Sequence, residues 1–435
     1  MKGYLCIPII GFFVLIAVVA GIFHILTDDE LHPEAKSWIE HYSRPVDLKG
    51  NAFIELIALS SAGECSRKQA INSYQSKLHE INTVPPSDFQ ELQYPNVNGL
   101  PNVFDETSFC YFDKENCLLK TARNRIELEA HTLQFESVIH RYLSISKLSN
   151  FTPINTFATK PIMDSLASLQ RLALLEVYFY ILDNNLELAA QQLSQLIVID
   201  RKLLINSPDL AFHALAIVNY ESFYQPLIIE LKRKGFSNWD LLAPAFVPLS
   251  IEEISFNSVW QSEFSNFAKN IESIGKRVRS NLWNVFTVKL KFKENMTLNR
   301  AFKFWHQMMI PEEVEKGGLI EIVKLHETSL DEQLEEVRWA SDKRFWFGLN
   351  NYRNIIGSIV EMTARPRFLS FYPEKLKFDL RILLLDLLIN QDAGFIAEAI
   401  NLEEYNNPYT GEAPTLSETD VCYTLEEDKV CVPLY

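Results

Sequence analysis

The N-terminal segment places the strongest constraint on how this chain can fold. Lys2 is followed by 25 uncharged, mostly apolar residues, Gly3 to Thr27, and then by three acids at 28–30. A helix needs about 20 mostly apolar residues to cross a bilayer, so this segment is long enough. The cation before it and the acids after it predict a cytoplasmic N-terminus and an exported remainder. The sequence therefore predicts a single-pass inner-membrane protein whose C-terminal part lies in the periplasm.

A cleaved signal peptide is the competing interpretation of this segment. The small residues at Val18-Val19-Ala20, before Gly21, have the spacing that signal peptidase accepts. The apolar run nevertheless continues to Leu26, beyond the roughly 7–15 residues usual for a signal peptide. We therefore expect residues 1–30 to form an uncleaved transmembrane anchor.

Composition limits the class of the exported part. The chain has 435 residues, 47% of them hydrophobic, which is enough for one large core or two ordinary cores. The 14 glycines and 19 prolines are too few for a turn-rich all-β protein. A formal net charge of −15 disfavours a nucleic-acid partner.

Four of the six cysteines form two close pairs, Cys110 with Cys117 and Cys422 with Cys431. Short loops of this kind close readily into disulfides in an oxidising compartment, so the pairs agree with export. The apolar residues around Cys422 and Cys431 predict a C-terminal hairpin with these two side chains opposite each other. Cys65 is left over and is predicted to be a buried free thiol.

Helical periodicity dominates the exported part. Residues 161–182 carry two apolar stripes, so this helix is expected to pack on two sides. A polar turn at 183–185 precedes a second helix, and Ser207-Pro208 is predicted to start a third that stops at Gly235. Further helical patterns cover 33–43, 51–82, 116–148, 250–275, 297–309, 318–341, 345–364 and 374–391.

These patterns predict an all-α fold in solenoid-like, tetratricopeptide-like layers, closed by a small disulfide-linked β-hairpin. No second copy of the helical unit recurs at the expected spacing of about 34 residues. The expected organisation after the anchor is as follows: 31–115, N-terminal helices and an irregular proline-containing loop at 83–115; 116–395, the main helical domain; 396–435, an irregular segment with the hairpin.

Several short segments resemble a group of membrane-anchored bacterial envelope proteins that have no assigned activity. They are Asn51-Ala52-Phe53-Ile54, the first cysteine pair, the segments at 183–190 and 293–300, and Asn407-Pro408-Tyr409-Thr410-Gly411-Glu412-Ala413-Pro414. The resemblance covers most of the exported chain. It implies a helical envelope protein, from a Gram-negative source, and transfers no functional residue.

Motifs that would indicate catalysis or cofactor binding are missing. Glu136 and His140 share a helix face, but His131 lies on another, so surface histidines near carboxylates explain them better than a metal site. The sequence contains no HExxH, G-x-S-x-G, P-loop or G-x-G-x-x-G motif. Residues 407–412 have turn chemistry, with a cation site as the alternative. No cofactor, metal or catalytic residue is therefore predicted.

A basic and aromatic segment at 276–305 interrupts the acidic chain. Apolar residues alternate with Thr or Lys between 286 and 293, which predicts a strand with a cationic face. Three uses compete: a lysine-protected edge strand, a surface for anionic lipid, or a docking patch for an acidic partner. The predicted contact residues are Lys289, Lys291, Lys293, Arg300, Lys303 and Trp305.

The sequence thus favours a membrane-anchored envelope scaffold or protein-interaction module over an enzyme. Its expected partners are the membrane, through the N-terminal helix, and a protein of the envelope. The alternatives are an envelope hydrolase that uses a carboxylate pair and a carrier of a hydrophobic ligand.

Overall fold

The computed structural model confirms a mostly helical fold with a small antiparallel sheet near the C-terminus. It describes residues 27–44, 46–60, 66–83, 110–114, 116–152, 162–280, 292–326, 328, 354, 371–391 and 395–434. Within these residues, no helix combines the length and apolar character needed to cross a membrane. The predicted anchor falls almost wholly on residues 1–26, outside the described residues. The solenoid-like arrangement of the helices stays a prediction.

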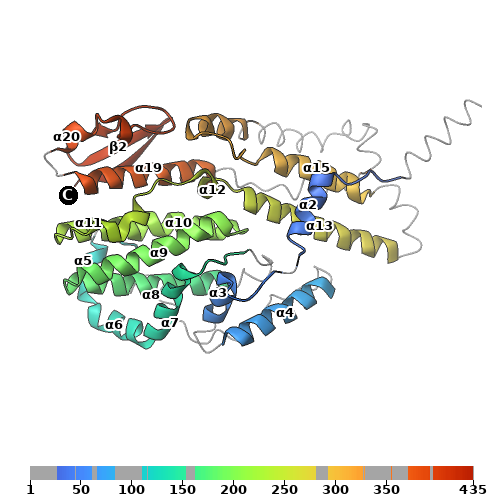
Figure 1. Ribbon diagram of the computed structural model, residues 1–435, viewed down its shortest axis with the longest axis horizontal. Coiled ribbons are helices and arrows are strands. Elements are labelled where there is room, and N and C mark those ends of the chain that lie inside the picture. The colour runs from blue at the N-terminus through green and yellow to red at the C-terminus, as the bar shows by residue number, and fades with distance from the viewer. Residues whose placement is uncertain are drawn as a thin grey trace, which may run out of the picture. The chain divides into compact units, whose positions relative to one another are not determined.

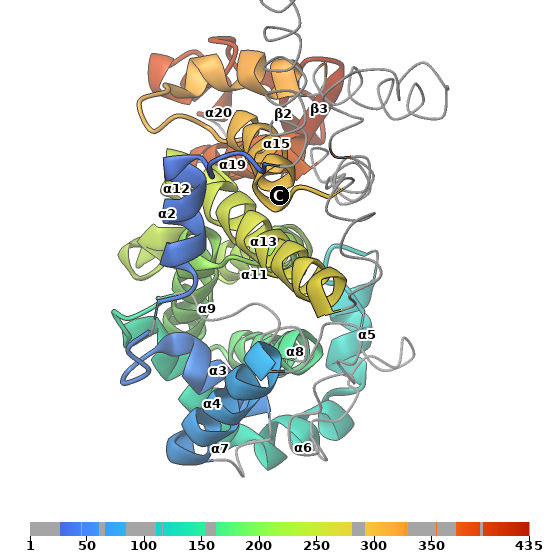
Figure 2. The same ribbon diagram turned by 90° about the vertical axis from the view of Figure 1, so that its right-hand side faces the viewer.

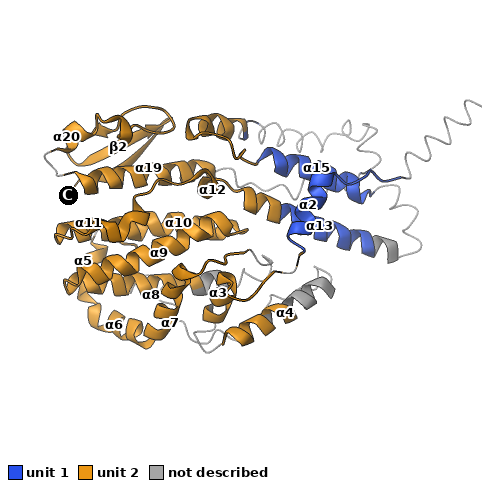
Figure 3. Cartoon of the chain, viewed as in Figure 1, with its two compact units in different colours: residues 1–43, 263–308, 326–367 blue, residues 44–262, 309–325, 368–435 orange. Residues whose placement is uncertain are grey.

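The chain divides into two compact units, each assembled from separate stretches of sequence (Figure 3). The smaller unit combines residues 1–43, 263–308 and 326–367, and the larger combines 44–262, 309–325 and 368–435. The division falls inside one helix, α13 (Asn257–Ser280).

Helices of the larger unit lie in successive layers around a central pair. This pair is α8 (Ile162–Leu182) and α9 (Leu186–Asn206), which pack against each other, and Figure 2 shows α3, α6 and α7 around α8. On the other side of α9 lie α10 and then α19, against which the sheet packs (Figure 1). The remaining elements of this unit are α3 (Ala52–Ser60), α4 (Arg67–Thr83), α5 (Cys117–Arg123), α6 (Arg125–Gln134), α7 (Glu136–Leu143), η2 (Ser144–Lys147), α10 (Leu210–Asn219), η4 (Tyr220–Tyr224), α11 (Gln225–Arg233), η5 (Trp239–Ala245), α12 (Ile251–Ile254), η6 (Lys316–Gly318), α19 (Phe371–Asn390), α20 (Ile396–Ala399) and η8 (Glu403–Tyr405).

The central helices form where the sequence predicts them. Both apolar stripes of α8 are buried, because the helix packs against α9 on one side and against α3, α6 and α7 on others. Asn184, with φ 61°, makes the turn to α9, and Gly235, with φ 83°, ends α11. Gly tolerates this left-handed conformation without the steric cost that other residues meet.

Two long predicted helices are interrupted. The pattern at 116–148 forms α5, α6, α7 and η2, with breaks at Asn124 and Phe135, whose ψ angles of 14° and 12° depart from the helical value. The pattern at 51–82 forms α3 and α4 instead of one helix.

The predicted start of α10 was also wrong. Its N-cap is Asp209 and not Ser207, and the Asp209 carboxylate accepts the backbone N–H of Ala211.

Aromatic side chains form the core of the smaller unit. Trp38, from α2 (Pro33–His41), contacts Phe264 of α13 and Phe302 of α15 (Glu294–Gln307), with ring centroids 5.7 and 4.8 Å apart. Trp305 of α15 packs against Phe264 and Phe267. The N-terminal helix is thereby joined to helices far along the chain.

The C-terminal sheet holds three antiparallel strands in the order β1 (Thr415–Leu416), β2 (Asp420–Leu425) and β3 (Asp428–Pro433). Cys422 and Cys431 are direct cross-strand partners and form the predicted disulfide. Cys110 and Cys117 form the second one. The predicted turn precedes the sheet: the Asn407 side chain accepts the Tyr409 N–H and donates to the Thr424 carbonyl.

Candidate functional site

Two of the six predicted contact residues are buried in the structure. Lys293 is 3% exposed and Trp305 is 2% exposed, so neither side chain can present itself to a partner. Lys293 precedes α15 in an extended conformation, and its backbone N–H donates to Oδ1 of Asn354 at 2.8 Å. The strand predicted over 286–293 put Phe292 and Lys293 on opposite faces, but both are buried. Tertiary packing here overrides the alternating pattern.

The remaining predicted contact residues divide into two groups. Lys303 is exposed and Arg300 is half-buried, and both belong to α15. Lys289 and Lys291 lie outside the described residues. The accessible part of the predicted patch therefore lies on α15, among the residues described.

The segment that follows the apolar stretch 3–27 is bound along α15. We refer to residues 28–32 as the strap. The carboxylate of Asp28 accepts the backbone N–H groups of Asn295 and Met296, at 2.9 and 3.1 Å. These are orphan donors in the first turn of a helix whose N-cap, Lys293, makes no side-chain capping bond. A negative charge is also favoured there by the helix dipole.

Two asparagines one helical turn apart extend this contact. The Asn295 side chain donates to the Asp29 carbonyl at 2.8 Å, and the Asn299 side chain donates to the Glu30 carbonyl at 2.7 Å. The backbone N–H of His32 donates to Oδ1 of Asn299 at 2.7 Å. Because Asn295 and Asn299 share a helix face, the strap runs along that face of α15.

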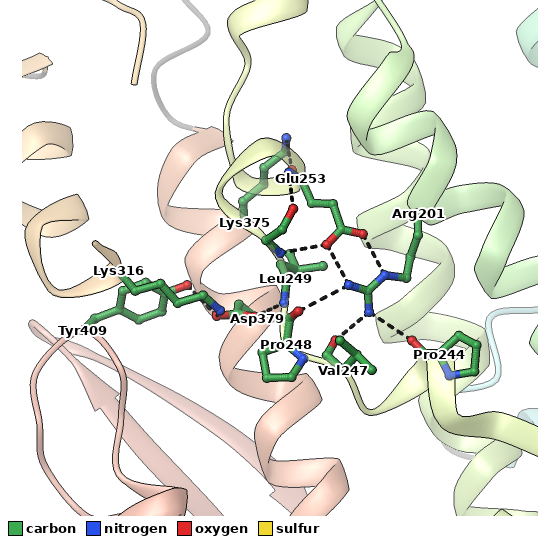
Figure 4. Close-up of polar contacts among 11 residues, drawn as sticks. Arg201, Pro244, Val247, Pro248, Leu249, Glu253, Lys316, Lys375, Asp379 and Tyr409 are labelled. Atoms are coloured by element: carbon green, nitrogen blue, oxygen red, sulfur yellow. Dashed lines mark hydrogen bonds and ion pairs between the residues drawn. The ribbon is translucent and has the colours of Figure 1, made fainter. Parts of the chain in front are cut away.

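A network of charged side chains joins α9 and α19 within the larger unit (Figure 4). Arg201 on α9 binds both carboxylate oxygens of Glu253, at 2.7 and 2.6 Å, and also donates to backbone carbonyls at Pro244, Val247 and Pro248. Glu253 is 3% exposed and closes a capping box with Ser250 at the start of α12. The network therefore fixes the segment between η5 and α12.

Asp379 on α19 completes the network. It is fully buried, and its carboxylate accepts the Leu249 N–H, the Lys316 ammonium at 2.6 Å and the Tyr409 hydroxyl at 2.7 Å (Figure 4). Burial raises the pKa of the Tyr409 hydroxyl well above its ordinary value, so it stays a donor. Asp379 thus binds the C-terminal turn and the loop before α12 to one helix.

Several lysines bind carbonyl groups at the ends of helices. Lys375 is fully buried and donates to the carbonyls of Glu253 and Ser255, at 2.7 and 3.0 Å, where α12 ends. Lys232 donates to carbonyls at the end of α19, and Lys202 to carbonyls of Ser146 and Leu148 beside η2. Cations are stabilising at these positions because the last carbonyls of a helix lack intrahelical donors. Burial lowers the pKa of Lys375 well below its ordinary value.

A second buried network surrounds Asp200 on α9. Its carboxylate accepts hydrogen bonds from Gln170 at 2.7 Å, Asn219 at 2.9 Å and Tyr224 at 2.6 Å. The Asn219 amide also donates to the Gln170 carbonyl oxygen at 2.9 Å. Full burial raises the pKa of Asp200 to about 6, while the three donors oppose that rise.

The histidines do not assemble a metal site in the described part of the chain. No group of three or more His, Cys, Asp or Glu side chains there could hold a metal ion. Glu136 and His140 form an exposed pair, with Nε2 and Oε1 3.6 Å apart. His213 is fully buried, its Nε2 lies 3.2 Å from the Ser207 carbonyl, and burial lowers its pKa well below the ordinary value.

Three buried groups with shifted pKa values bind other parts of the fold. Asp200, His213 and Lys375 each have a shifted pKa and no more than 4% exposure. A catalytic acid or base must reach its substrate directly or through one water, which such burial prevents in this state. Their arrangement stabilises helix junctions.

Sequence reasoning missed the Asp200 network. A signal was present, because Leu193, Ile197, Asp200 and Leu204 occupy one helix face and only the third is polar. A carboxylate at a core position needs donors from neighbouring elements, but the sequence does not say which elements supply them.

No protein-family model, no curated protein and no solved structure matches the chain.

Proposed function

We propose that the chain is a membrane-anchored envelope protein whose helical body works outside the cytoplasm as a non-catalytic interaction module. The observation that carries this proposal is the strap. The apolar stretch of the predicted anchor ends at Thr27, and the next residue, Asp28, already binds the N-terminus of α15. An anchor ending there would be joined to the folded body without a free linker.

The disulfides support the exported location. Cys110–Cys117 and Cys422–Cys431 are both formed, and structural disulfides persist mainly in oxidising compartments. The acidic residues at 28–30 are also on the side of the apolar segment that is exported under the positive-inside rule.

The buried networks support a non-catalytic role. Asp200 and Lys375, whose pKa values are both shifted, bind interhelical donors and a helix end, and their side chains are inaccessible. In the proposed function α15 supplies the contact surface, through exposed Lys303 and half-buried Arg300. Their charge suits an acidic protein partner.

A photo-crosslinking experiment tests this function in its membrane setting. A photoreactive amino acid replaces Lys303 in the full-length chain, expressed in a Gram-negative bacterium, and an equivalent substitution at exposed Val247 is the control. The proposal predicts one discrete protein adduct from position 303 and none from position 247. Crosslinks only to lipid, or equal adducts from both positions, would contradict the assignment of a protein contact to α15.

A further inference from the structure

A single turn of π-helix, η4 (Tyr220–Tyr224), lies between α10 and α11. One carboxylate oxygen of Asp200 accepts hydrogen bonds from residues at both ends of this turn. Asn219 immediately precedes this turn and Tyr224 is its last residue. Both donate to Oδ2 of Asp200, at 2.9 and 2.6 Å. Residues five apart in an α-helix point about 140° away from each other, from 3.6 residues per turn. The π-turn, whose hydrogen bonds span five residues, brings both side chains to the same face.

The groups facing Asp200 come from four other elements. α7 supplies the phenol of Tyr142 and the π-turn that of Tyr224, while α8 and α10 supply the neutral amides Gln170 and Asn219. Burial raises the pKa of both phenols well above the ordinary value, so they stay protonated. Within this cluster Asp200 is therefore the group that changes charge near neutral pH.

The cations next to Asp200 along α9 are engaged elsewhere. Arg201 binds Glu253, and Lys202 binds the carbonyls of Ser146 and Leu148. Neither contributes to the pKa of Asp200, which is set by burial and by the three donors. The charge on Asp200 is thus compensated by hydrogen bonds alone.

We propose that Asp200 is the proton-binding group of a pH-dependent latch, in which the neutral carboxyl closes the π-turn onto α9 and the ionised carboxylate loosens it. The direction of this pH dependence follows from the linkage between proton binding and opening. The closed, buried state binds the proton more tightly than an opened state in which water reaches the carboxyl group. Opening therefore releases a proton and becomes easier as the pH rises through about 6.

The latch has a structural path to α19. α11 follows the π-turn directly, and Lys232 on α11 donates to the carbonyls of Ile389 and Gln391 at the end of α19. Inside the turn, Glu221 pairs with Arg381 of α19. Loosening the turn would weaken both contacts, so one proton on Asp200 biases the junction of these helices.

Hydrogen exchange of the full-length chain in detergent micelles tests the latch. Protection of the backbone amides at 217–229 is measured at about pH 5 and about pH 7.5, after correction for the intrinsic exchange rates. The latch predicts about tenfold higher protection at pH 5 than at pH 7.5, out of the roughly 100-fold that a pKa difference of about two permits over the whole titration range. In Asp200→Asn the pH dependence disappears.

Two further variants keep the test decisive. Asp386 on α19 also has a pKa raised to about 6, and its charge acts on Tyr220 in the π-turn, so Asp386→Asn tests this acid separately: the pH dependence at 217–229 should persist in this variant, because Asp200 is retained. Tyr224→Phe removes one donor to the ionised form, so it moves the midpoint of the pH dependence upward. Equal protection of the wild type at both pH values overturns the latch. So does a pH dependence that survives Asp200→Asn, or an unchanged midpoint in Tyr224→Phe.

Discussion

Asp28 caps a helix that lies 268 positions away in the sequence: its Oδ1 accepts the backbone N–H of Met296 at 3.1 Å. The first charged residue after the apolar stretch 3–27 therefore takes part in the fold of the smaller unit. This contact links the N-terminal segment to α15, which carries the exposed part of the predicted contact surface.

Removing the Asp28 carboxylate is expected to weaken the first turn of α15. Side-chain caps contribute about 1 kcal/mol, within a range of roughly 0.5–2 kcal/mol, so Asp28→Ala should lower the stability of this turn by that amount. Hydrogen exchange at 294–298 would show about fivefold faster opening. Glu30→Ala is the matched control, because this neighbouring acid is exposed and its carbonyl contact with Asn299 is retained. Equal exchange in the two variants would argue against capping by Asp28.

Charge reversal separates the buried from the exposed lysine of the predicted surface. Lys293→Glu places an acid in the buried environment of a lysine and should destabilise the chain by about 3 kcal/mol or more. Lys303→Glu changes an exposed side chain and should stay within about 0.5 kcal/mol. Thermal unfolding followed by tryptophan fluorescence distinguishes them, and similar midpoints would contradict the burial of Lys293. Contact with a partner is therefore best tested at Lys303.

The Arg201–Glu253 pair should show strong coupling. Arg201→Met leaves the buried Glu253 carboxylate without its bidentate partner, and such losses cost about 3–5 kcal/mol. Glu253→Gln keeps a neutral hydrogen-bonding group, and the double variant avoids the unpaired charge. We therefore expect the double variant to be more stable than Arg201→Met alone, as measured by denaturant unfolding. Additive losses would show that the two side chains act independently.

Asp200 should make global stability depend on pH in the unusual direction for an acid. Its pKa is about 6 in the folded chain and about 3.9 in an unfolded one, so between these values the folded state holds more protons. This contribution is fully present below about pH 4 and is lost as the pH rises to about 6, by roughly 3 kcal/mol in total. The difference in unfolding free energy between the wild type and Asp200→Asn should therefore shift by about 2 kcal/mol of this total between about pH 4 and pH 7. A constant difference would show that the folded pKa of Asp200 is not raised.

The central helices could be predicted because local and tertiary requirements agree there. α8 has apolar residues on two sides and packs on both, and the turn at Asn184 and the end at Gly235 have suitable residues for positive φ. The disulfide between Cys422 and Cys431 followed from the hairpin pattern around them.

Other features depend on partners far away in the sequence. The breaks at Asn124 and Phe135 carry no Pro or Gly, so the apolar pattern continues through them. Lys293 sits in an alternating pattern typical of a surface strand, yet a contact with Asn354 and the surrounding packing bury it. The donors around Asp200 come from three other elements, which no local pattern specifies.

The most direct test of the proposed function asks where the helical body lies relative to the membrane. Val247→Cys gives an exposed thiol in the full-length chain, with Cys6 and Cys65 replaced by Ser. Spheroplasts are treated with a membrane-impermeant maleimide, and their membranes are then washed with alkaline carbonate. We predict that the chain is labelled from outside and stays in the washed membranes. Labelling only after lysis, or release by carbonate, would contradict a membrane-anchored body outside the cytoplasm.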